Sequence, residues 1–106
     1  MRLDITWRNI DPSETITERA ERKLSKVAKH LREPMEAHMV VRHEKRRYDV
    51  ELTITAPGFQ TAVRSSTDDF IASVDGVMNR MERTARRHRE RVLHREHQAP
   101  AEAQRY

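Results

Sequence analysis

Hydrophobic and polar residues alternate at the start of the chain. From Arg2 to Arg8, Leu3, Ile5 and Trp7 fall on one side, and polar residues fall on the other. A period of two is typical of a strand with one buried face. We therefore expect a half-buried strand over these residues.

The period then changes to that of a helix, with either Asp11 or Ser13 as the N-cap residue. Proline disfavours helical geometry in the residue before it, so the helix is expected to end near residues 32–34, at Pro34. Its predicted buried face consists of Ile16, Ala20, Leu24, Val27 and Leu31.

Residues 36–67 return to the strand pattern and predict three strands. Met39, Val40 and Val41 mark the first, and Phe59, Thr61 and Val63 mark the third. In the middle strand, Tyr48, Val50, Leu52 and Ile54 alternate with Asp49, Glu51, Thr53 and Thr55. The connections at 44–47 and 56–58 are short enough for hairpins, so an antiparallel meander is expected.

A second helix is expected to follow, opened by a capping box formed by Ser66 and Asp69. Beyond about His94 the pattern fades, and we expect a domain over residues 1–95 followed by a flexible tail over 96–106. The apolar stripe of this helix comprises Phe70, Val74, Val77, Met78, Met81, Ala85 and Val92.

The expected fold class is α+β, with the order β-α-β-β-β-α. The strand-helix-strand start favours a crossover that makes the first two strands parallel. Because the strands alternate, one face of the four-stranded sheet is apolar, and both helices should pack on that face.

Composition narrows the class of protein. The chain has 106 residues, enough for one domain, and no cysteine. No apolar stretch approaches the roughly 20 residues of a membrane span, and no signal peptide is apparent. We expect a cytoplasmic protein without a membrane partner.

Positive charge is concentrated in the second predicted helix. The whole chain carries a net charge of +4, whereas residues 79–95 hold seven arginines against two glutamates, a local net of +5. A solvated polar face is one interpretation; an anionic partner is the other, because solvated faces mix acids and bases more evenly. Nearly opposite the apolar stripe lie Arg80, Arg83, Arg87, Arg91 and His94.

The first predicted helix sorts its charges by sign. Glu14, Glu18 and Glu21 line one flank of its apolar stripe, and Arg19, Lys23, Lys26 and His30 line the other. If the second helix lies beside the basic flank, the two helices form one cationic surface. Arginine suits contacts with phosphate because its planar fork binds two oxygens at once.

The sequence offers few candidates for catalysis or metal binding. It has no cysteine nucleophile, nucleophile elbow or glycine-rich phosphate loop. His88, His94 and His97 do not share one helical face with a carboxylate, and Asp75 is interpreted as structural. We expect no catalytic residue, metal, cofactor or small-molecule substrate.

The sequence has few aromatic residues on which nucleic-acid bases could stack. For an RNA partner, recognition through the backbone and the shape of the RNA is therefore favoured over base stacking.

Three stretches together resemble the short ribosome hibernation-promoting factors, a family that includes the ribosome-associated inhibitor and was formerly labelled sigma-54 modulation proteins. They are residues 2–6, residues 23–27, and residues 69–76 continued through Met81 to Arg91. The resemblance covers residues 1–95. It implies a layout related to double-stranded-RNA-binding domains, and binding to the small ribosomal subunit near the messenger and transfer-RNA sites that silences ribosomes in stress or stationary phase. The residues it implies for rRNA contact are Lys23, Lys26, Arg80, Arg83, Arg87, Arg89 and Arg91.

Two other functions stay open at this stage. One is a regulator that binds an acidic protein partner in transcription, and the other is a hydrolase that uses the histidines. Longer family members carry a second, dimerisation domain, which we do not expect within these 106 residues, so promotion and prevention of ribosome dimers are both compatible with the sequence. We expect the free protein to be a monomer.

Overall fold

The computed structural model describes the backbone of residues 1–103 and the side chains of residues 1–95. Its elements follow the expected β-α-β-β-β-α order. They are β1 (Arg2–Arg8), α1 (Glu14–Ala28), β2 (Glu36–Glu44), β3 (Arg47–Ala56), β4 (Phe59–Thr67) and α2 (Phe70–Ala103).

The four strands form one sheet in the order β1-β2-β3-β4. β1 is parallel to β2, while β2, β3 and β4 form the antiparallel meander. Val41 pairs with Val50, and Leu52 pairs with Val63, so apolar residues of neighbouring strands share one face. The parallel first pair and the meander are both confirmed.

Two-residue turns close both hairpins. Glu44 pairs with Arg47 across Lys45 and Arg46, which both have positive φ, the pattern of a type I′ turn. Ala56 pairs with Phe59 across the second turn, in which a proline precedes Gly58 at φ 71°. Glycine suits that position because an L side chain rarely adopts this backbone conformation.

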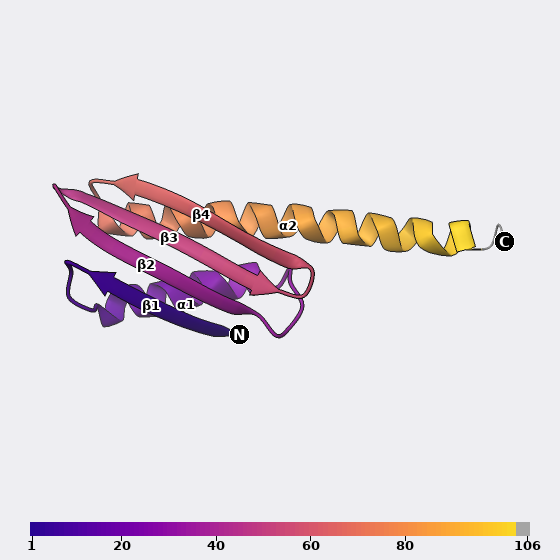
Figure 1. The fold of residues 1–106 in the computed structure, drawn as a ribbon, viewed down its shortest axis with the longest axis horizontal. Coiled ribbons are helices and arrows are strands. Elements are labelled where there is room, and N and C mark those ends of the chain that lie inside the picture. The colour runs from indigo at the N-terminus through magenta and orange to yellow at the C-terminus, as the bar shows by residue number, and fades with distance from the viewer. Residues whose placement is uncertain (104–106) are drawn as a thin grey trace.

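Both helices pack on the same face of the sheet, as the sequence predicted, and Figure 1 shows α2 running alongside β3 and β4. The core between them is apolar and closed. Buried from the helices are Ile16, Ala20, Leu24, Val27, Val74, Val77, Met78, Met81 and Ala85; buried from β2 and β3 are Ala37, Met39, Val41, Val50, Leu52, Ile54 and Ala56.

Ser73 connects the first turn of α2 to the sheet through hydrogen bonds. Its side chain is fully buried, and its hydroxyl donates a hydrogen bond of 2.8 Å to the backbone carbonyl of Tyr48. The same oxygen lies 2.7 Å from the hydroxyl of Thr67. A buried hydroxyl needs such partners, so these contacts fix where α2 starts relative to β3 and β4.

Two sequence predictions about helix ends were wrong. Helix α1 ends at Ala28, short of Pro34, because the amides of His30 and Leu31 bond the carbonyls three residues back and tighten the chain. Ser66 does not cap α2, because it is still part of β4.

The caps themselves are single side chains. The side chain of Asp69 accepts a hydrogen bond of 3.1 Å from the amide of Ile71, and so caps α2 without Ser66. At α1, Ser13 is the N-cap residue, and its hydroxyl accepts a hydrogen bond from the amide of Ile16.

Helix α2 extends well beyond the end of the sheet and makes the molecule long, at 61 × 21 × 17 Å (Figure 1). Its backbone is helical to Ala103, further than the periodic pattern reached. The predicted tail, residues 96–106, falls where side chains lie outside the described part, so the division at residue 95 stays a prediction. Within the described residues, no helix combines the length and the apolar character that a bilayer crossing requires.

Candidate nucleic-acid interface

The outer face of α2 carries a row of exposed arginines. Arg83, Arg87 and Arg91 follow each other at intervals of four residues, and each is exposed. Residues four apart lie above one another on a helix, with a rise of about 6 Å per step. No salt bridge involves these three guanidinium groups within residues 1–95, so the row presents its charge to solvent.

Arg80 belongs to the same helix and is exposed, but its guanidinium has a partner within the protein. Its Nη1 atom donates a hydrogen bond to the backbone carbonyl of Arg64, on the edge strand β4. Arg64 in turn pairs with Glu51 of β3 at 2.5 Å. The guanidinium of Arg80 thus provides a hydrogen-bond donor for a backbone carbonyl on the edge strand of the sheet. The sequence alone did not indicate this contact.

The basic flank of α1 lies beside α2, as the sequence analysis required for one cationic surface. Asp75 of α2 connects the two helices: Arg19 donates hydrogen bonds of 2.8 and 2.7 Å to its two carboxylate oxygens. Lys23 adds a contact of 3.6 Å between Nζ and Oδ1. The structural interpretation of Asp75 is therefore confirmed.

This contact shifts the ionisation of both partners. The pKa of Asp75 is lowered, mainly by the hydrogen bonds from Arg19, with the charge of Lys23 adding to the effect and burial opposing it. The pKa of Arg19 is raised, mainly by the hydrogen bond to Asp75. Asp75 thus offsets part of the positive charge contributed by Arg19 and Lys23.

The seven basic residues predicted to bind rRNA therefore fall into two groups. Lys23 and Arg80 have partners inside the protein, with Asp75 and the Arg64 carbonyl respectively. Arg80 is nevertheless exposed, as are the other five: Lys26, Arg83, Arg87, Arg89 and Arg91.

A groove lies at the end of α1, where α2 runs past the β3–β4 turn. It has a volume of about 510 Å³ and is lined by residues 29–32, by Pro57 and Gly58, and by five residues of α2, namely His88, Arg89, Val92, Leu93 and Arg95. Of the predicted site residues, only Arg89 lines it. Sequence reasoning missed Lys29 and Arg95, although both are basic residues at the ends of the two cationic stretches.

Within residues 1–95, the aromatic residues do not form a platform on the open sheet face. Trp7, His43, Tyr48 and Phe70 form a cluster at the start of α2, with Tyr48 stacked on Phe70 at 5.1 Å and on His43 at 4.1 Å. The open face of β3 instead carries the expected Asp49, Glu51, Thr53 and Thr55.

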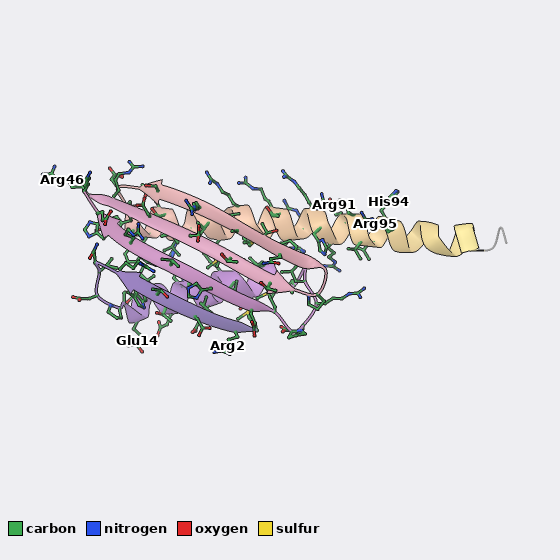
Figure 2. All side chains as sticks on the ribbon, viewed as in Figure 1. Arg2, Glu14, Arg46, Arg91, His94 and Arg95 are labelled. Carbon is green, nitrogen blue, oxygen red and sulfur yellow. The ribbon has the colours of Figure 1, made fainter. Side chains whose placement is uncertain are left out.

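The candidate histidines are placed apart from one another. His88 is half-buried against Phe59, with ring centres 5.1 Å apart, and His94 is exposed on the distal part of α2 (Figure 2). The side chain of His97 lies outside the described residues. Within those residues, no three His, Cys, Asp or Glu side chains gather in a way that could hold a metal ion.

Comparison with known proteins identifies a family match over most of the chain. The family model described as Sigma 54 modulation protein / S30EA ribosomal protein matches residues 3–93. A ribosome hibernation promoting factor from Azotobacter vinelandii is 21% identical over 104 residues, covering 97% of each chain. The Escherichia coli K12 protein of the same name is 22% identical over 92 residues, covering 87% of this chain and 97% of its own.

Two solved structures share the fold. The N-terminal domain of Thermus thermophilus Protein Y has a TM-score of 0.73 at 23% identity, over 81% of this chain and 93% of its own. A ribosomal subunit interface protein from Coxiella burnetii has a TM-score of 0.72 at 20% identity, over 85% and 99%. At these identities the likeness establishes the β-α-β-β-β-α layout.

Proposed function

Because the chain belongs to the Sigma 54 modulation protein / S30EA ribosomal protein family, we propose that it is a ribosome hibernation factor. It binds rRNA of the small subunit near the messenger and transfer-RNA sites, and silences ribosomes under stress or in stationary phase. It blocks these sites sterically, without catalysing a reaction, and it acts in the cytoplasm. The names of the curated relatives support this proposal.

The single observation that carries the RNA contact is the exposed row of Arg83, Arg87 and Arg91 on α2. Guanidinium groups spaced along a helix can each bind phosphate oxygens in pairs. Arg89 and Lys26 widen the cationic surface toward α1. Lys23 and Arg80 contribute less directly, since part of their binding capacity is used within the protein.

Phosphate contacts make binding depend on salt, because each neutralised phosphate releases a counterion. Contacts by three arginines change the slope of log affinity against log salt concentration by roughly 2 to 3. A factor held mainly by apolar contacts would show a much flatter dependence. The salt slope thus measures whether the arginine row lies on the RNA.

The test is co-sedimentation of the protein with purified ribosomes on sucrose gradients at low and high salt. We expect it to migrate with the small subunit and the intact ribosome at low salt and to dissociate at high salt. The variant Arg83→Gln/Arg87→Gln/Arg91→Gln should bind more weakly and with a smaller salt slope.

A matched control removes the same charge from the opposite side of the molecule. Arg2, Arg8 and Arg42 are exposed on the open sheet face, away from both helices. The Gln variant of these three should keep most of the binding. Equal loss in the two triple variants would mean that net charge alone matters and would reject the site. Wild-type protein that stays at the top of the gradient at every salt would reject the function and favour an acidic protein partner.

A further inference from the structure

The groove beyond the end of the sheet combines two kinds of surface. Its rim carries Lys29, Arg89 and Arg95, and no acidic residue is among the described residues that line it. Its lining also includes apolar side chains: Leu31 and Val92 are half-buried, and Leu93 remains 43% exposed. An anion with a flat apolar body would match both parts.

The groove exists because α2 is longer than the sheet that supports it (Figure 1). Val92 and Leu93 continue the apolar side of the helix past the β3–β4 turn, where no strand covers them. A single exposed leucine needs no explanation, but here it adjoins other apolar residues in a concave site. The volume of about 510 Å³ lies in the range of small-ligand sites.

The polar residues in the groove favour a nucleotide over other anions. His30 and His88 place imidazole rings in the lining, and Arg89 adds a planar guanidinium. Unstacked RNA bases bind to aromatic rings, imidazoles and guanidinium planes, while their phosphates bind nearby cations. Arg95 lines this groove and also a neighbouring one that Arg87 and Arg91 line, so the groove adjoins the proposed interface.

We propose that this groove binds one nucleotide that is unstacked from a single-stranded segment of RNA. The base lies against Leu31, Val92 and Leu93, and the phosphate lies against Lys29, Arg89 and Arg95. The idea rests on the proposed function for the source of the RNA. The charge pattern alone predicts contacts with the RNA backbone, and the groove would add contacts with one base.

The first test is NMR titration of the full chain, isotope-labelled at backbone amides and methyl groups, with adenosine and uridine 5′-monophosphate. We expect selective shifts of the methyl signals of Leu31, Val92 and Leu93. Inorganic phosphate at the same concentration should leave these methyl groups unshifted. Absence of methyl shifts, or equal shifts with inorganic phosphate, would overturn the proposal. Equal methyl shifts with hexaglutamate would also overturn it and would assign the groove to acidic peptides.

A pair of matched variants tests the groove on a longer ligand. Leu93 and Ile71 are both aliphatic residues of α2, 43% and 44% exposed, but only Leu93 lines the groove. Leu93→Ala should weaken binding of a fluorescent single-stranded RNA octamer about fivefold, the scale of removing one partly covered apolar side chain from a contact. Ile71→Ala should leave the affinity unchanged. Equal affinities for both variants, with both folded by circular dichroism, would overturn the groove.

These measurements are independent of the ribosome. Methyl shifts without ribosome co-sedimentation would support the groove and reject the proposed function. Ribosome co-sedimentation that persists with normal salt dependence, without nucleotide shifts, would reject the groove and keep the function.

Discussion

Asp75 accepts two parallel hydrogen bonds from the guanidinium of Arg19, at 2.8 and 2.7 Å, across the contact between α2 and α1. The two side chains are 25% and 31% exposed, so the pair is neither a loose surface contact nor fully buried. Lys23 shares the same carboxylate. One acidic residue of α2 therefore binds two basic residues of the α1 flank that faces it.

Replacement of this carboxylate should destabilise the fold in a pH-dependent way. The pKa of Asp75 is lowered from 3.8 in the folded state, so its stabilising contribution is complete above that value and is lost as pH falls through the folded pKa. At pH 7, Asp75→Asn should lower Tm by about 5 °C. The gap between variant and wild type should close below about pH 4.

Thermal unfolding followed by circular dichroism from pH 7 to pH 2 checks this expectation. Asp4→Asn is the control, because Asp4 pairs with Arg2 at 3.3 Å in a contact that is more than half exposed on both sides. Exposed pairs contribute little, so its Tm should change much less. A Tm gap for Asp75→Asn that stays constant down to pH 2 would contradict the ionic origin of the effect.

At Gly76, α2 passes close to Ser65 of β4. A Cβ atom placed there would lie 2.7 Å from Oγ and 3.2 Å from Cβ of Ser65. In an open helix, Gly→Ala gains about 1 kcal/mol from helix propensity, but overpacking costs about 1 to 3 kcal/mol. We therefore expect Gly76→Ala to lower the free energy of unfolding by about 1 kcal/mol.

A double-mutant cycle with Ser65→Ala separates the two contributions. Removal of Oγ relieves the closer of the two contacts, so Gly76→Ala should be less destabilising in that background. Urea unfolding of the four proteins measures the coupling. Additive effects would mean that Ser65 is not the obstacle.

Local patterns predicted most of the fold because they record which side of each element is buried. The alternation of Val50, Leu52 and Ile54 with polar residues marks a strand with one covered face, and that is how β3 packs. The sorting of charge on α1 left its orientation conditional on where α2 lies, and the structure places the basic flank beside α2 and its acidic residue Asp75.

Features that depend on distant parts of the chain were missed. The partner of Arg80 is a backbone carbonyl on β4, and no side-chain pattern encodes a carbonyl. The groove requires the end of α1, a hairpin turn and α2 to converge. Ser66 has the spacing of a capping box with Asp69. The pairing of β3 with β4 continues through Ser66, however, so Ser66 pairs with Asp49 and does not cap α2.

Arg80 and Arg83 should separate stability from RNA binding. Arg80→Gln removes a hydrogen bond to the Arg64 carbonyl and should lower the free energy of unfolding by about 0.5 to 1 kcal/mol. Arg83→Gln should change it by less than about 0.5 kcal/mol, because Arg83 is exposed and forms no salt bridge within residues 1–95. Ribosome binding should rank in the reverse order, with Arg83→Gln the weaker binder. Co-sedimentation and urea unfolding of both proteins measure this, and a weaker binding of Arg80→Gln would refute the assignment.

The β2–β3 hairpin turn offers a last test, because its two residues adopt a backbone conformation that their residue types disfavour. Lys45 and Arg46 have φ values of 49° and 64°, in the left-handed region. That conformation costs L-residues roughly 1 to 2 kcal/mol each, and type I′ turns favour Asn-Gly for this reason. Lys45→Asn/Arg46→Gly should raise the free energy of unfolding by about 1 kcal/mol.

Lys45→Gln/Arg46→Gln is the matched control, since it removes the same two charges and keeps the backbone cost. Its stability in urea should stay near that of the wild type; an equal gain in both variants would trace the effect to charge repulsion instead. Arg46 lies at the end of the molecule where β2 meets β3, far along its long axis from Arg91 on α2 (Figure 2), so both variants should keep ribosome binding. Equal weakening of that binding would extend the RNA contact to the hairpin and explain why two strained basic residues stand where Asn-Gly would be more stable.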